Sequence, residues 1–171
     1  MTGYEMEIFP DFPIKGVNFF DISSILQNDN WFEKTAEQFR ESYPGPQPDY
    51  VLGIESRGLI YATVVSGAIE RGLVMARKPG KLPGELLGAQ YGKEYGKDRL
   101  EIQKSKITPG AKYLIVDDIL ATGNTIKAVA DLITELGGEI LGIWVYGEID
   151  GLGGRELLKE YPLYSVVNLK E

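Results

Sequence analysis

The chain has 171 residues, 43% of them hydrophobic and 25% charged, which indicates one globular domain over residues 1–171. It contains no cysteine and no histidine, which excludes disulfides, thiolate or imidazole metal sites and mechanisms that need a histidine base. Its net charge of −7, its acidic N-terminal segment and its lack of a long apolar stretch favour a cytoplasmic protein without nucleic-acid or membrane partners.

The first half of the chain predicts an irregular start and then alternating helices and strands. Residues 1–25 mix prolines and Gly16 with aromatic side chains and are expected to be irregular. Beyond them, apolar residues recur at helical spacing, and a later apolar run leads into an alanine-rich segment. The expected elements are a helix over 30–42, a strand over 50–54, a helix after Gly58 to about Gly72, and a strand over 73–76.

The segment 77–112 is unusually basic and holds nine of the 18 basic residues but only four acidic ones. Residues 80–96 are rich in glycine and predict a long loop, of a kind that is usually functional or disordered. A strand is expected over 100–106. A local basic segment in an acidic protein suits a small anionic ligand, although a solvated charged loop would give the same composition.

The second half continues the alternation of strands and helices. The apolar run 113–116 predicts a strand buried on both faces, and Gly137 and Gly138 end a helix expected over 124–136. Further strands are expected over 140–146 and 166–169. Strands that alternate with helices predict an α/β fold with a parallel, twisted sheet flanked by helices.

The strongest functional pattern is the run from Leu114 to Thr125. An apolar strand leads into Asp117 and Asp118, then into a small-residue loop that opens a helix. Ligands of parallel sheets bind beyond the carboxyl ends of the strands, and a helix start attracts anions. Two carboxylates beside an anion site suit a phosphorylated sugar, whose hydroxyls or bound cation face the acids. The alternative is that Thr122 or Asn124 only caps the helix.

This run resembles the donor-binding motif of the type I phosphoribosyltransferases, whose donor is 5-phosphoribosyl-1-diphosphate. The resemblance implies that Asp117 and Asp118 hold the ribose hydroxyls, with a catalytic role. The 5′-phosphate would lie in the loop formed by Ala121, Thr122, Gly123, Asn124 and Thr125. Asn124 stands where many relatives have glycine. The same resemblance implies magnesium, held through donor oxygens and water without direct protein ligands, and a homodimer.

The turn at residues 54–58 extends the resemblance to this family, and the segments 77–84, 94–97 and 100–104 are similar to one branch of it, the adenine phosphoribosyltransferases. The implied diphosphate-binding residues are Glu55, Ser56, Arg57, Arg77, Lys78, Lys81 and Tyr95. Arg57 would also be catalytic, and Arg77 could act across a dimer interface. Glu94 would assist proton movement at the base, within a flexible lid loop at about 80–99.

The N-terminal stretch, about residues 1–25, resembles the small hood that covers the base in these enzymes. The implied base-binding residues are Val17, Asn18, Phe19, Phe20 and Ile149, with Phe19 at the stacking position. An arginine often stands at the position of Phe20, and Phe12 and Phe20 are equally consistent with a place in the core.

The resemblance implies transfer of a phosphoribosyl group to adenine, with AMP and diphosphate as products. Because Asn18 and Phe20 depart from the pattern, hypoxanthine, guanine or xanthine remain alternative bases. A non-catalytic regulator that senses the donor is a further alternative.

Overall fold

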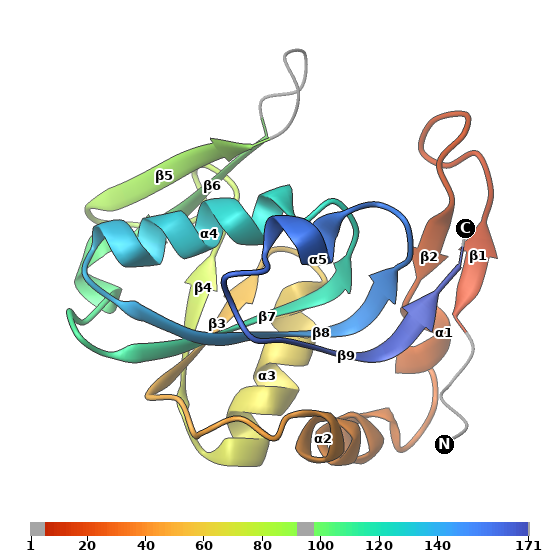
Figure 1. Cartoon of the computed structure of the whole chain (residues 1–171), viewed down its shortest axis with the longest axis horizontal. Coiled ribbons are helices and arrows are strands. Elements are labelled where there is room, and N and C mark those ends of the chain that lie inside the picture. The colour runs from red at the N-terminus through yellow and green to blue at the C-terminus, as the bar shows by residue number, and fades with distance from the viewer. Residues whose placement is uncertain (1–5, 92–97, 171) are drawn as a thin grey trace.

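The computed structural model describes residues 6–91 and 98–170 (Figure 1). Its centre is a five-stranded parallel sheet in the order β4-β3-β7-β8-β9. The strands are β3 (Tyr50–Ile54), β4 (Gly72–Ala76), β7 (Lys112–Leu120), β8 (Glu139–Ile149) and β9 (Leu163–Leu169). This parallel α/β sheet is the one that the sequence predicts.

Helices cover both faces of the sheet (Figure 1). They are α2 (Trp31–Ser42) and α3 (Gly58–Ile69) on one face, with α4 (Asn124–Glu135) and the short α5 (Gly154–Leu157) on the other. Strand β7 supplies both cores, because its alternate residues point to opposite faces. Tyr113 and Ile115 join the core under α4, while Leu114 and Val116 join the core under α3. None of the helices in the described ranges could span a bilayer.

The N-terminal segment is more ordered than the sequence predicts. β1 (Glu7–Phe9) pairs antiparallel with β2 (Phe19–Asp21), and α1 (Ser23–Leu26) comes next. We call residues 7–21 the hood. The prolines and Gly16 lie in the connection between the two strands, where the Gly16 N–H donates to Asp11 Oδ1 at 2.7 Å. The prolines and Gly16 therefore shape a turn, and the flanking strands still form.

The prediction of a long loop over 80–96 is wrong for residues 86–91, which form a strand, and residues 92–96 lie outside the described residues. β5 (Leu86–Tyr91) pairs antiparallel with β6 (Asp98–Gln103), and η1 (Lys104–Lys106) comes after β6. Leu87, Ala89 and Tyr91 alternate along β5 and pack against the main core, so the strand is fixed by burial of one face. The intervening glycine concealed this alternation in the sequence.

Candidate active site

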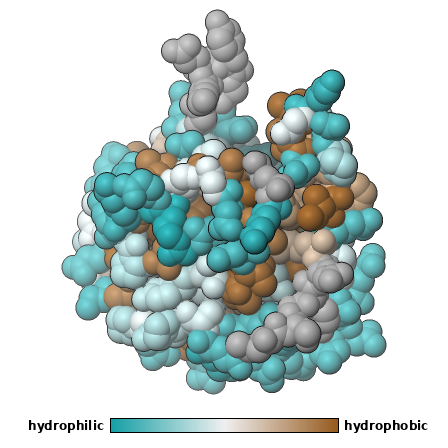
Figure 2. Space-filling view, turned by 45° about the vertical axis from the view of Figure 1, so that its right-hand side comes forward, coloured by the Kyte–Doolittle hydropathy of each residue, from teal (hydrophilic) through white to brown (hydrophobic). Residues whose placement is uncertain are grey.

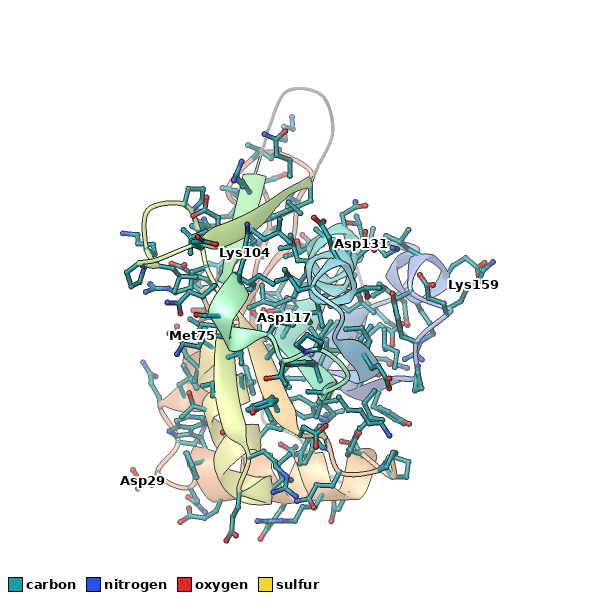
Figure 3. The ribbon with its side chains drawn as sticks, turned by 90° about the vertical axis from the view of Figure 1, so that its left-hand side faces the viewer. Asp29, Met75, Lys104, Asp117, Asp131 and Lys159 are labelled. Carbon is teal, nitrogen blue, oxygen red and sulfur yellow. The ribbon has the colours of Figure 1, made fainter. Side chains whose placement is uncertain are left out.

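The candidate site lies at the carboxyl end of the sheet, between β3 and β7. From β3 the chain crosses to β4 on one side and later returns to β7 on the other. Such a switch point opens a crevice beyond the strand ends, where ligands of α/β proteins bind. Figure 3 shows Asp117 in the middle of the molecule, between the strands and the β5–β6 hairpin. β7 continues to Leu120, so the acid pair lies within the strand and not in the turn expected after Val116.

The two aspartates are nearly buried, with 8% of Asp117 and 6% of Asp118 exposed. Arg57 Nε lies 2.6 Å from Asp118 Oδ2 in an ion pair. Asp117 Oδ1 accepts the Asp118 N–H at 2.9 Å. Burial, followed by the negative charge of Asp118, raises the pKa of Asp117 well above its ordinary value. Asp117 therefore retains a proton more readily than an exposed aspartate would.

Gly58 allows Asp117 to approach the first turn of α3. A Cβ at position 58 would overlap Asp117 Oδ1 and would lie 3.0 Å from the Asp117 Cα. A side chain at Gly58 would thus displace the carboxylate. The sequence indicated Gly58 only as the end of a turn. The contact could not be predicted from it, because Gly58 begins α3 and Asp117 lies in β7, far along the chain.

Arg57 connects the acid pair to the hood. Beside its ion pair with Asp118, its Nη1 donates to the Phe20 carbonyl oxygen at 2.9 Å. Its Cζ also lies 4.8 Å from the centroid of the Phe19 ring, a cation–π distance. One guanidinium therefore fixes an aromatic ring relative to the two carboxylates.

The loop 121–125 forms a small anion-sized hollow beside Asp117. A cavity of about 80 Å³ is lined by Asp117, Ile119, Leu120, Ala121, Thr122, Gly123, Thr125 and Ile126. Gly123 is the N-cap of α4 with φ 79°, and no side chain caps the helix. Asn124 Nδ2 instead donates to Thr122 Oγ1 at 3.0 Å. The helix-cap alternative is therefore wrong, and the helix start remains available to an anion.

The candidate diphosphate residues gather at the ends of β3 and β4. Arg77 Nε donates to Glu55 Oε2 at 3.1 Å, and the Lys78 N–H donates to the same oxygen at 2.8 Å. Burial alone would raise the pKa of Glu55, but these hydrogen bonds outweigh it and lower the pKa. Glu55 thus orients Arg77, while the side chains of Ser56, Lys78 and Lys81 are exposed.

The candidate base residues divide into exposed and buried ones. Val17 is exposed, whereas Asn18 and Phe19 are half-buried, and Phe12 packs edge-on against Phe19 at 5.2 Å. Phe20 is only 3% exposed, so its ring belongs to the core and only its backbone faces Arg57. Ile149 ends β8 and is 9% exposed. Burial explains why an apolar residue can stand at position 20.

Glu94 and Tyr95 lie outside the described residues. The sequence interpretation overlooked Tyr91, the last residue of β5. Burial raises the pKa of Tyr91, and its side chain is hydrogen-bonded to Thr125. Thr125 belongs to the loop 121–125, which we call the anion loop. The alternation of Leu87, Ala89 and Tyr91 was the signal that could have identified it.

The chain is similar to known proteins along most of its length. The family model "Phosphoribosyl transferase domain" matches residues 21–166. The adenine phosphoribosyltransferase of Chloroflexus aurantiacus is 43% identical over 158 residues, 92% of this chain and 91% of the relative. That of Acidobacterium capsulatum is 41% identical over 162 residues, 95% of this chain and 90% of the relative.

Solved structures agree with these relatives. The adenine phosphoribosyltransferase of Thermoanaerobacter pseudethanolicus has a TM-score of 0.92 and 38% identity, with 96% of each chain covered. The enzyme of Saccharomyces cerevisiae, complexed with an imino-altritol bisphosphate and adenine, has a TM-score of 0.87 and 38% identity, with coverage of 95% of this chain and 94% of that one. The chain belongs to the phosphoribosyltransferase family and, within it, to the adenine phosphoribosyltransferases.

Proposed function

We propose that the protein transfers the 5-phosphoribosyl group from 5-phosphoribosyl-1-diphosphate to adenine, giving AMP and diphosphate. One observation supports this most directly: Arg57 contacts both the Phe19 ring and Asp118, beside the anion loop. An aromatic ring, an acid pair and a phosphate hollow thus stand in the order of the base, ribose and phosphate of AMP. The yeast relative binds adenine together with a bisphosphate in its solved structure.

The site residues suit a displacement at the anomeric carbon. The ring nitrogen of adenine forms a bond to that carbon while the bond to the diphosphate oxygen breaks, and diphosphate leaves with the electron pair. Asp117 and Asp118 hold the ribose hydroxyls, and their negative charge favours a cationic sugar in the transition state. Arg57, Arg77, Lys78 and Lys81 stabilise the leaving diphosphate, and Glu94 takes the proton from the base.

Magnesium fits this site through the donor. No group of three or more acidic side chains that could hold a metal occurs in residues 6–91 and 98–170. The acid pair at the site is Asp117 and Asp118, of which Asp118 is engaged by Arg57. Asp117 and Asp118 would therefore meet a hydrated ion that is held chiefly by donor oxygens, and the ion would neutralise charge on the diphosphate.

A homodimer remains a prediction from the resemblance, and a cytoplasmic location remains a prediction from the composition and the N-terminal segment. The hydrogen bond from Arg77 to Glu55 lies within one chain. Sedimentation velocity of the purified protein tests the dimer, and a single species with the mass of one 19.0 kDa chain would contradict it.

The experiment that tests the function is a base panel. Purified protein is mixed with magnesium, 5-phosphoribosyl-1-diphosphate and adenine, hypoxanthine, guanine or xanthine, and nucleotide formation is monitored. The double variant Asp117→Asn, Asp118→Asn serves as the control and should be nearly inactive. Turnover with adenine alone is expected. Turnover with another base would assign the same chemistry to that base. Donor binding without any product would favour the non-catalytic regulator that senses the donor.

A further inference from the structure

The anion loop packs against the short helix α5, to which the proposed mechanism assigns no role. Gly154, the first residue of α5, is buried against it. A Cβ at Gly154 would overlap the Ala121 carbonyl oxygen and would lie 2.8 Å from a Leu120 methyl group. A Cβ at Gly123 would lie 3.0 Å from the Gly154 carbonyl oxygen. The two backbones therefore support each other without intervening side chains.

The short helix α5 is fixed to the sheet by the next residue, Arg155. Its Nε donates to Glu148 Oε1 of β8 at 2.8 Å, and its Nη1 donates to the Leu163 carbonyl oxygen of β9 at 3.1 Å. Ser165 Oγ donates to Glu148 Oε2 at 3.2 Å, and the Glu148 side chain is only 12% exposed. Charge-assisted bonds of a guanidinium to a carboxylate are directional, so they fix orientation as well as distance.

The other end of α5 is held by Leu158, which is fully buried in the core shared with α4. Its methyl group would lie 3.3 Å from a Cβ at Gly123. Because α5 has only four residues, it has little stability of its own. Its position therefore depends on Leu158 at one end and on Arg155 at the other.

We propose that Arg155 is a positioning residue for the 5′-phosphate: with Glu148 and Leu163 it holds Gly154 against Ala121 and Gly123 and so keeps the anion loop in its binding shape. We call Arg155, Glu148 and Leu163 the Arg155 clamp. The inference rests on the proposed function, in which the loop 121–125 receives the donor's 5′-phosphate. The clamp touches no reacting atom and acts through the loop backbone.

The test compares two ligands that occupy different parts of the site. On the proposed function, ribose 5-phosphate binds in the loop 121–125, whereas inorganic diphosphate binds near Arg77. In Arg155→Gln and Gly154→Ala, we expect the dissociation constant of ribose 5-phosphate to rise about tenfold, since small displacements of binding groups are costly. The dissociation constant of diphosphate should stay near the wild-type value. Calorimetry on the full-length protein measures both.

The controls separate the clamp from general stability. Arg155→Lys should restore part of the affinity. Glu156→Gln changes a carboxylate on the same helix whose ion-pair partner is the exposed Lys159, and it should leave both constants unchanged. Unchanged ribose 5-phosphate binding in Arg155→Gln, or equal weakening of both ligands, would overturn the inference. Absence of wild-type turnover would overturn the proposed function instead, and the calorimetry would still decide on the clamp.

Discussion

Successive residues of a strand point to opposite faces of the sheet, so Asp117 and Asp118 have different surroundings. Asp117 lines the hollow of the anion loop, while Asp118 pairs with Arg57 on the side of α3 and the hood. Among residues 6–91 and 98–170, the second carboxylate forms an ion pair, with Arg57 Nε at 2.6 Å, whereas the first forms none. We therefore expect opposite effects on stability when each acid is replaced by its neutral isostere, although both replacements should lower turnover.

The first prediction concerns Asp117→Asn. Because the folded-state pKa of Asp117 is raised, wild-type stability falls as the pH rises from the ordinary aspartate range through that raised pKa. The asparagine variant lacks this loss, so at neutral pH it should be more stable by about 1 kcal/mol, and should unfold about 2–4 °C higher. Thermal unfolding at pH 5 and pH 8 measures the difference.

Asp118→Asn serves as the comparison, because it leaves Arg57 without its ionic partner. It should melt below the wild type at both pH values. If Asp117→Asn melts no higher than the wild type at pH 8, burial of Asp117 does not destabilise the fold.

The second prediction concerns Gly58→Ala. The added methyl group would collide with the Asp117 carboxylate, so we expect kcat/KM to fall about 100-fold and stability to fall by about 1–3 kcal/mol. Gly67→Ala is the matched control, since it lies in the same helix α3 with no atom within 4 Å of the new Cβ. That variant should keep full activity and gain up to about 1 kcal/mol. Equal activity of the two alanine variants would contradict this role of Gly58.

At the scale of elements, the sequence predicted the site best where the residues that form it are adjacent in the chain. The run from Leu114 to Thr125 predicted a buried strand, an acid pair and an anion loop because all three are adjacent in the chain. The packing roles of Gly58 and Gly154 were not predicted, because their constraints come from contacts with Asp117 and Ala121, which lie far from them in the chain. β5 was missed because its alternation is short and its packing partner, α4, lies more than thirty residues further along the chain.

Figure 2 shows apolar side chains gathered on the projecting hood. Five large apolar side chains between positions 8 and 17 are exposed: Ile8, Phe9, Phe12, Ile14 and Val17. The hood pairs with no strand of the main sheet in the described residues, so its position depends on side-chain contacts. The bond from Arg57 to the Phe20 carbonyl and the contact with Phe19 are two of them.

The third prediction therefore concerns Arg57→Lys. Lysine keeps the charge but is a point donor that cannot meet Asp118, the Phe20 carbonyl and the Phe19 ring together. We expect the KM for adenine to rise about tenfold, equivalent to about 1.4 kcal/mol, through loss of one charged hydrogen bond. Steady-state kinetics with saturating donor measures it. Arg40→Lys, at an exposed position on α2, should behave as the wild type. An unaltered adenine KM in Arg57→Lys would show that Arg57 does not position the hood for adenine binding.

At the scale of the whole molecule, an acidic protein binds a highly anionic donor. The net charge of −7 repels an anionic donor at long range, whereas Arg57, Arg77, Lys78 and Lys81 are the residues proposed to attract it locally. The screening length is about 8 Å at physiological ionic strength, so the local groups dominate once the donor is in the site. Added salt should therefore weaken donor binding, because it screens this local attraction more than it relieves the distant repulsion.

The fourth prediction follows from that balance. Between about 0.05 M and about 0.3 M sodium chloride, the KM for 5-phosphoribosyl-1-diphosphate should rise about fivefold, while that for the neutral base adenine should stay nearly constant. Lys81→Gln should reduce the slope, because Lys81 is exposed and its carbonyl accepts from Arg77 at 3.5 Å. Lys112→Gln removes the same charge at the start of β7, about 17 Å of strand before Asp117. Because that separation exceeds the screening length, the Lys112 variant should keep the wild-type slope, and identical slopes in all three proteins would show that the basic segment does not attract the donor.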